Sequence, residues 1–247
     1  MSLVVTTYVP EGIIMASDSR QTLTAEKKST EGTLQDKINI INSDSIYKTF
    51  SLDKFGIGIN TFGQDLIKGI PTGGYIKQFE EILVEADNVE TTAEKLLKFF
   101  RSIDENANTG FHLAGYKREQ KEELKKATNK QVSSPHVYFI HIKENKLERK
   151  NFKDADNRVL YGATWGGEAD IIAGLLKIGD QNAPQIVWDA MSLQDAIEFS
   201  IFTISTTTNT MRFQARPKTV GGPIDVLLIT PDQIKWIQRK EFHGMQT

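Results

Sequence analysis

Cysteine is absent from this chain of 247 residues, and histidine is scarce. The first absence excludes disulfides, thiolate metal sites and a cysteine nucleophile. The four histidines show no ligand spacing, and no His-Glu-x-x-His or Gly-x-Ser-x-Gly motif occurs; they are His112, His136, His141 and His243. We therefore expect neither a metal site nor a bound cofactor, and a Ser-His-Asp hydrolase is disfavoured.

The chain also has no large excess of either positive or negative charge. Thirty basic residues nearly balance 32 acidic ones, for a net charge of −2. Nucleic-acid binding needs clustered positive charge, so no nucleic-acid partner is expected. No apolar run reaches the roughly 18 residues of a membrane span, and no basic segment followed by an apolar one opens the chain. These absences predict no membrane partner and a cytoplasmic location.

What the sequence does contain is an alternation of strand and helix patterns without a linker. Short apolar and alternating runs predict strands at 4–9, 13–19, 37–41, 47–53, 55–62, 111–116, 136–142, 147–152, 158–164, 224–230 and 233–239. Helical periodicity predicts helices at 64–68, 75–86, 95–103, 168–178 and 192–206. The stretch 23–35 is a polar excursion between predicted strands, and the charged stretch 117–131 is expected to be a solvated hairpin loop. This order predicts one α+β domain, 1–247, a four-layer αββα sandwich in which helices cover two stacked antiparallel sheets.

The first predicted hairpin carries an acid and a base at its end. With its turn centred on Glu11, Val4 would face Asp18, and Ser2 would lie opposite Arg20. If Met1 is removed, the Ser2 hydroxyl lies beside its own α-amine, whose ordinary pKa is near ~8. A hydroxyl activated by its own amine is a known design for a nucleophile.

Two further residues bear on this hypothesis. Lys48 could supply the nearby positive charge that keeps the α-amine of Ser2 deprotonated. Thr6 and Thr7 are poorer nucleophile candidates, because processing before Thr6 would delete half of the first strand. A purely structural alternative also stands, in which Asp18 and Lys48 form a buried ion pair that fixes the hairpin register.

Several segments together resemble the β subunits of the proteasome and their bacterial relatives, the N-terminal nucleophile hydrolases. The resemblance covers most of the chain in the right order, and it rests on GIIMASDSRQT, YKTFSLDKFGIGINTFGQD, LYGATWGGEADIIAGLL, SLQDAIEFSIFTIS and GGPIDVLLITPDQIKWIQRKEF. It implies a peptide or amide substrate and self-association as a ring or a smaller assembly.

The resemblance also implies residue roles. The nucleophile falls on Ser2 and the backbone amide of the oxyanion hole on Thr61. The other implied catalytic residues are Asp18, Lys48 and Arg20, and an apolar substrate pocket is implied at Gln21, Ile46 and Ile59.

Three departures from the family pattern concern the surroundings of the nucleophile. A supporting serine falls on Gly166, and a supporting aspartate falls near Pro217, unless Thr164, Thr219 or Arg216 substitutes. The segment between Asp18 and Lys48 contains an insertion. Two functions therefore stay open, an N-terminal nucleophile amidohydrolase or peptidase and a catalytically inactive proteasome-like subunit with a scaffolding or binding role.

Overall fold

The computed structural model describes residues 2–28, 34–119, 132–154, 158–180 and 182–241, and these contain two antiparallel five-stranded sheets. The first sheet has the order β12 (Gly162–Gly167), β1 (Leu3–Val9), β2 (Gly12–Ser17), β13 (Asp225–Ile229) and β14 (Ile234–Gln238). The second has the order β11 (Lys146–Arg149), β10 (Val132–His141), β9 (Thr109–Glu119), β6 (Ile57–Gly63) and β5 (Thr49–Leu52).

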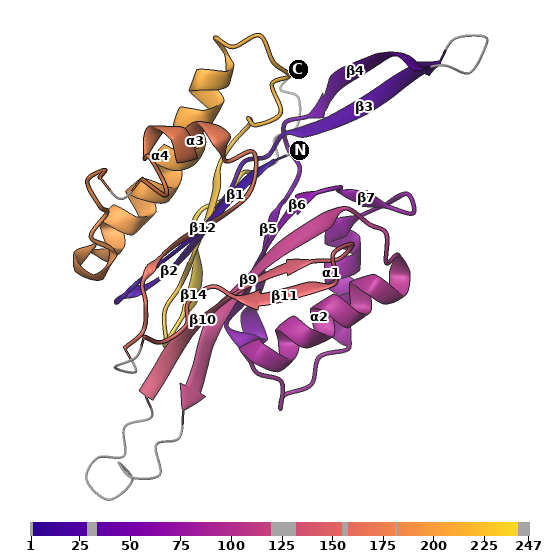
Figure 1. Ribbon diagram of the computed structural model, residues 1–247. Helices are drawn as coiled ribbons and strands as arrows, with labels where there is room; N and C mark the ends of the chain where they lie inside the picture. The colour runs from indigo at the N-terminus through magenta and orange to yellow at the C-terminus, as the bar shows by residue number, and fades with distance from the viewer. Residues whose placement is uncertain (1, 29–33, 120–131, 155–157, 181, 242–247) are drawn as a thin grey trace, which may run out of the picture.

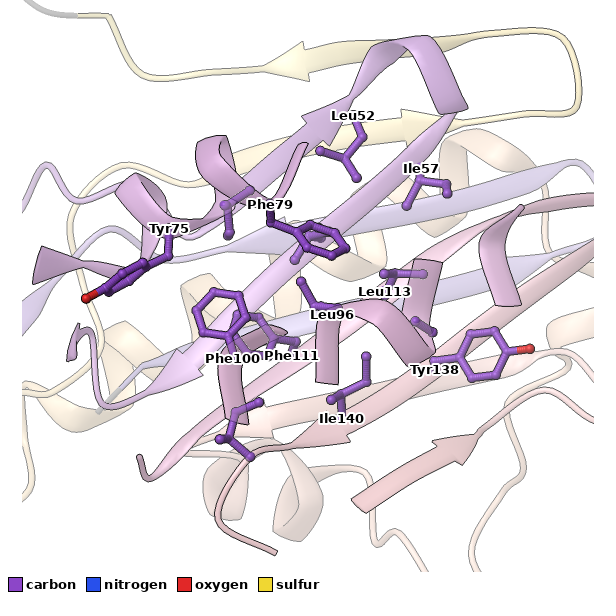
Figure 2. Packing of buried hydrophobic residues seen from close by; sticks show 14 of the residues in the cluster. Leu52, Ile57, Tyr75, Phe79, Leu96, Phe100, Phe111, Leu113, Tyr138 and Ile140 are labelled. Atoms are coloured by element: carbon purple, nitrogen blue, oxygen red, sulfur yellow. The ribbon is translucent and has the colours of Figure 1, made fainter. Parts of the chain in front are cut away.

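Helices cover the outer face of each sheet (Figure 1). The second sheet packs against α1 (Thr72–Glu81) and α2 (Val89–Ile103) through an aromatic core in which the rings of Phe100 and Phe111 lie 4.6 Å apart (Figure 2). The first packs against α3 (Asp170–Leu175) and α4 (Leu193–Met211). Two short 3-10 helices, Asp53–Phe55 and Trp188–Ala190, lie in connections.

A third apolar cluster joins the two sheets face to face. It includes Ile13 and Met15 from β2, Ala114 from β9 and Val137 from β10. Because β1 and β2 have helices on one side and the other sheet on the other, both strands are buried along their whole length. The layers therefore follow the predicted order of helices, sheet, sheet and helices.

Local sequence explains where the longer helices begin. Asn88 caps α2, because its side chain accepts from the N–H groups of Glu90 and Thr91 while Thr91 accepts from the N–H of Asn88. Ser192 caps α4 in the same reciprocal way with Asp195. The helix α2 therefore begins at Val89, before the start of the predicted range 95–103.

The register of the first hairpin differs from the prediction by one residue. Val9 pairs with Gly12 and Val4 with Ser17, because the turn consists of Pro10 and Glu11 alone. The predicted pairing of Val4 with Asp18 is therefore wrong. Asp18 lies beyond the end of β2, where its N–H donates to the carbonyl of Leu3 at 3.2 Å.

Two other segments differ from the predicted elements. The expected helix at 64–68 is a small hairpin of β7 (Leu66–Ile67) and β8 (Ile70–Pro71), because Lys68 and Gly69 adopt positive φ angles of 47° and 81° at a tight turn. The polar stretch 23–35, in which no strand was predicted, contributes to β3 (Gln21–Lys28) and β4 (Leu34–Ser43), a two-stranded ribbon that extends away from both sheets (Figure 1). Residues 29–33 of this stretch lie outside the described residues.

The remaining predicted strands and helices overlap the observed elements. Of the expected loop at 117–131, residues 117–119 belong to β9, and 120–131 lie outside the described residues. In the described part of the chain, no helix combines the length and apolarity needed to cross a membrane.

The space between the sheets also holds a neutral histidine. His112 is fully buried, its Nδ1 lies 3.1 Å from the Thr6 hydroxyl, and the rings of Phe62 and Phe139 flank it. Burial, together with the charge of Lys150, lowers the pKa of His112 from 6.5 to about 3. The folded protein therefore keeps this imidazole neutral through the acidic range in which the unfolded chain protonates it.

This difference predicts acid sensitivity. Below pH 6.5 only the unfolded state binds the proton, so between pH 7 and pH 5 His112 should lower the free energy of unfolding by about 2 kcal/mol. Urea unfolding at several pH values would measure this loss. His112→Gln should show a shallower pH dependence than the native chain, and equal slopes for the two proteins would contradict the assignment.

Candidate active site

Asp18 forms the centre of a buried charged cluster at the end of β2. Its Oδ1 lies 2.7 Å from the Lys48 ammonium and accepts from the N–H of Leu3 at 3.0 Å. Its Oδ2 accepts from the N–H groups of Arg20 at 3.1 Å and Gly221 at 3.0 Å. The Asp18 carboxylate is completely buried, so these four donors replace the water that it gives up on folding.

Both the side-chain ammonium and the backbone carbonyl of Lys48 are held by hydrogen bonds. Its ammonium also donates to the carbonyl of Arg20 at 2.6 Å, and its own carbonyl accepts from the N–H of Thr61 at 2.8 Å. The first contact aims the ammonium at Asp18. The second engages the Thr61 amide, so the oxyanion donor expected at Thr61 has no free N–H to offer a substrate.

Ser2 lies next to this ion pair. It is 4% exposed, and its carbonyl accepts from the N–H of Glu168 at 2.8 Å. The close approach requires glycine at 167, which has a φ of +90° and whose Cβ would lie 1.8 Å from the Ser2 carbonyl oxygen. Met1 lies outside the described residues.

A cavity of about 350 Å³ opens beside Ser2 and Lys48. Eight of its eleven lining residues are polar or charged, and two are leucines. The lining residues are Ser2, Arg20, Gln21, Thr22, Leu23, Lys48, Gly63, Gln64, Asp65, Leu66 and Asn108.

The three expected substrate residues occupy different places. Gln21 lines the cavity, as expected. Ile59 is fully buried in the core beneath α1 and α2, and Ile46 is absent from the cavity lining, with its N–H donated to the carbonyl of Ser19. Asp65 could not be identified from the sequence, because nothing in the local pattern shows that the segment after β6 lies against the start of β3.

Arg20 points its charge away from Asp18. Its guanidinium binds Asp44 in a bidentate pair at 2.6 and 2.9 Å and donates to the carbonyl of Lys218 at 3.1 Å. This pair holds the pKa of Asp44 below its ordinary value. The side chain of Arg20 thus binds the segment that follows β4, at the base of the β3–β4 ribbon. Its backbone N–H donates to Asp18, and its carbonyl accepts from Lys48.

A phenylalanine fills the space beside Gly166. A Cβ on Gly166 would lie 2.4 Å from the Phe62 ring, and one on Gly110 would lie 2.3 Å from it. The glycine where the family has a supporting serine is therefore a packing requirement of Phe62. A serine at 166 would need this ring to move.

The proposed substitutes for the missing supporting residues have other partners. Arg216 pairs with Glu168 at 2.6 Å and with Asp170 at 2.5 Å. Thr219 lies against the Met211 sulfur at 3.9 Å. Neither these two nor Thr164 belongs to the described residues that line the cavity.

A second buried ion pair, between Asp225 and Lys240, lies close to the Asp18–Lys48 pair. The sequence pattern gave no sign of it. Asp225 accepts from the backbone N–H of Lys240 at 2.8 Å and pairs with its ammonium. That ammonium lies 4.3 Å from the centre of the Tyr47 ring. Burial lowers the pKa of Lys240, and the positive charge of Lys48 contributes to the same shift. The pair ties the chain after β14 to the segment that carries Lys48.

Comparison with known proteins addresses the fold. No protein-family model matches the sequence, and no curated protein matches it. A solved structure of Anbu from Hyphomicrobium sp. strain MC1, a Gly-1 mutant, is similar with a TM-score of 0.59 and 16% sequence identity, over 97% of this chain and 86% of that one. This confirms the resemblance at the level of the fold: the chain has the architecture of Anbu, a bacterial proteasome-like N-terminal nucleophile hydrolase.

Proposed function

We propose that the protein is an N-terminal nucleophile hydrolase that cleaves an amide or peptide bond with Ser2 as the first residue of the mature chain. The observation that carries the proposal is the buried Asp18–Lys48 pair beside a cavity that Ser2 lines. A buried, fully hydrogen-bonded ion pair beside a cavity open to a substrate is an environment in which a terminal hydroxyl and its α-amine can act as nucleophile and base.

The chemistry needs only groups at this site. The Ser2 Oγ attacks the carbonyl carbon while its proton passes to the α-amine, and the amine then gives this proton to the leaving nitrogen as the C–N bond breaks. Water attacks the resulting ester, which releases the acid and restores the hydroxyl. The positive charge of Lys48 favours the unprotonated α-amine, and Asp18 holds that charge in place.

A second candidate function rests on the same site. Phe62 fills the space that a supporting side chain at Gly166 would need, and the Thr61 amide is already engaged. Both observations favour a catalytically inactive subunit with a scaffolding or binding role. Either function is compatible with the proposed cytoplasmic homo-oligomer, as a ring or a smaller assembly.

The mass of the purified chain, combined with covalent labelling, separates the two candidates. The reagent is a peptide electrophile that bonds to both the hydroxyl and the α-amine of an N-terminal residue. The hydrolase proposal expects a chain that begins at Ser2 and one adduct, located on Ser2 by peptide mapping. A retained Met1 with no adduct would overturn this proposal and support the inactive subunit.

A further inference from the structure

The charges around the cavity do not cancel. Lys48 is paired with Asp18, and Arg20 is paired with Asp44, so each cation at the lining has its own acid. Asp65, the acid among the lining residues, forms no ion pair with any residue that the structure describes. The lining therefore carries one negative charge that no basic side chain of the described residues pairs with directly, although the charge of Lys48 acts on it from a distance.

Asp65 is held in one orientation. Its carbonyl accepts from both the N–H and the hydroxyl of Thr72, at 2.8 and 2.7 Å, which fixes its backbone at the start of α1. Its Oδ2 accepts from the Gln21 amide at 2.5 Å. Gln21 is oriented in turn by Asn42, which donates to its Oε1 at 2.6 Å.

This chain of amides favours the ionised acid. Because Asn42 occupies the Gln21 oxygen, the NH₂ group of Gln21 is directed at Asp65, and an NH₂ group only donates. Burial nevertheless raises the pKa of Asp65, so its carboxylate lacks part of the solvation that it would have in water. A cationic ligand would replace that lost solvation.

Two partly exposed leucines add apolar surface to the cavity. Leu23 on the ribbon is 40% exposed, and Leu66 on the small hairpin is 38% exposed. Both line the cavity together with Asp65. Leucine side chains that can contact an aliphatic stem, together with a carboxylate that can bind a cationic head, suit a lysine or arginine side chain.

We propose that Asp65 is the specificity-determining residue of this cavity and selects a substrate with a basic side chain next to the bond that Ser2 attacks. The proposal rests on the function proposed above for its catalytic part. Recognition of the basic group requires only the Asp65 carboxylate, the Gln21 amide that orients it and the two leucines. Binding can therefore be tested without turnover.

The test measures binding of two uncleaved ligands, a short peptide amide that ends in lysine and the same peptide with norleucine, to the Ser2→Ala protein by calorimetry. We expect the lysine peptide to bind about tenfold more tightly or better, because a hydrogen bond to a charged group is involved. Asp65→Asn should remove the difference in affinity between the two peptides, while the backbone contacts of residue 65 with Thr72 remain. The matched control is Asp53→Asn, which removes a carboxylate charge near the other end of β6. This control should leave the difference in affinity unchanged.

The outcomes distinguish this proposal from the hydrolase proposal. Preferential binding that depends on Asp65 supports the specificity assignment even if native protein hydrolyses neither peptide. Equal binding of the two peptides, or a preference that survives Asp65→Asn in a protein with native thermal stability, overturns it. Hydrolysis of both peptides by native protein at equal kcat/KM would overturn it while supporting Ser2 as the nucleophile.

Discussion

Replacing Ser2 with alanine is expected to lower kcat/KM for amide hydrolysis by about 10³-fold or more, because loss of a nucleophile removes the covalent route altogether. Alanine is also small, so removal of Met1 should proceed and the α-amine should still be present. The variant therefore separates the hydroxyl from the amine. The measurement is steady-state hydrolysis of a peptide amide, with the N-terminus of each variant verified by mass.

Two control variants test whether the loss of activity is specific to the Ser2 hydroxyl. Ser2→Thr keeps a hydroxyl beside the α-amine and should retain measurable activity. Ser102→Ala removes an exposed hydroxyl on α2 that bonds only within its own helix, and it should leave kcat/KM unchanged. Equal activity of Ser2→Ala and native protein would exclude Ser2 as the nucleophile and with it the proposed mechanism.

The features that the sequence predicts well are those with local patterns. Alternating and apolar runs locate the strands of both sheets, and the capping serine at 192 marks the start of α4. The Asp18–Lys48 pair was expected because Lys48 was the candidate for a buried positive charge beside Asp18, and the observed 2.7 Å contact agrees. The strand and helix predictions need no knowledge of contacts between distant segments, whereas the choice of Lys48 also followed the family resemblance.

The features that the sequence did not reveal depend on contacts between distant segments. The Gln21–Asp65 bond joins the start of β3 to the segment after β6, 44 residues away in sequence. The Phe62 ring fills space at both Gly110 and Gly166. Only the segment 37–41 of the β3–β4 ribbon was predicted as a strand, because the charged and hydroxyl-bearing residues of β3 lower its strand signal. The hairpin register was one residue off because the turn contains two residues instead of three.

The Asp18–Lys48 pair should also dominate the stability of this end of the fold. Asp18→Ala is expected to lower the free energy of unfolding by about 3–5 kcal/mol, because it leaves the Lys48 ammonium buried without its counterion. The N–H groups of Leu3, Arg20 and Gly221 lose their acceptor in the same step. Urea unfolding followed by circular dichroism measures the loss.

A double variant and a surface variant serve as controls for the Asp18→Ala measurement. Asp18→Leu combined with Lys48→Met removes both charges, so it should destabilise the protein less than Asp18→Ala alone. Glu105→Ala breaks an exposed pair with Arg101 and should cost less than about 1 kcal/mol. If Asp18→Ala costs no more than Glu105→Ala, the buried pair does not hold the hairpin end, and the geometry on which Ser2 depends has another origin.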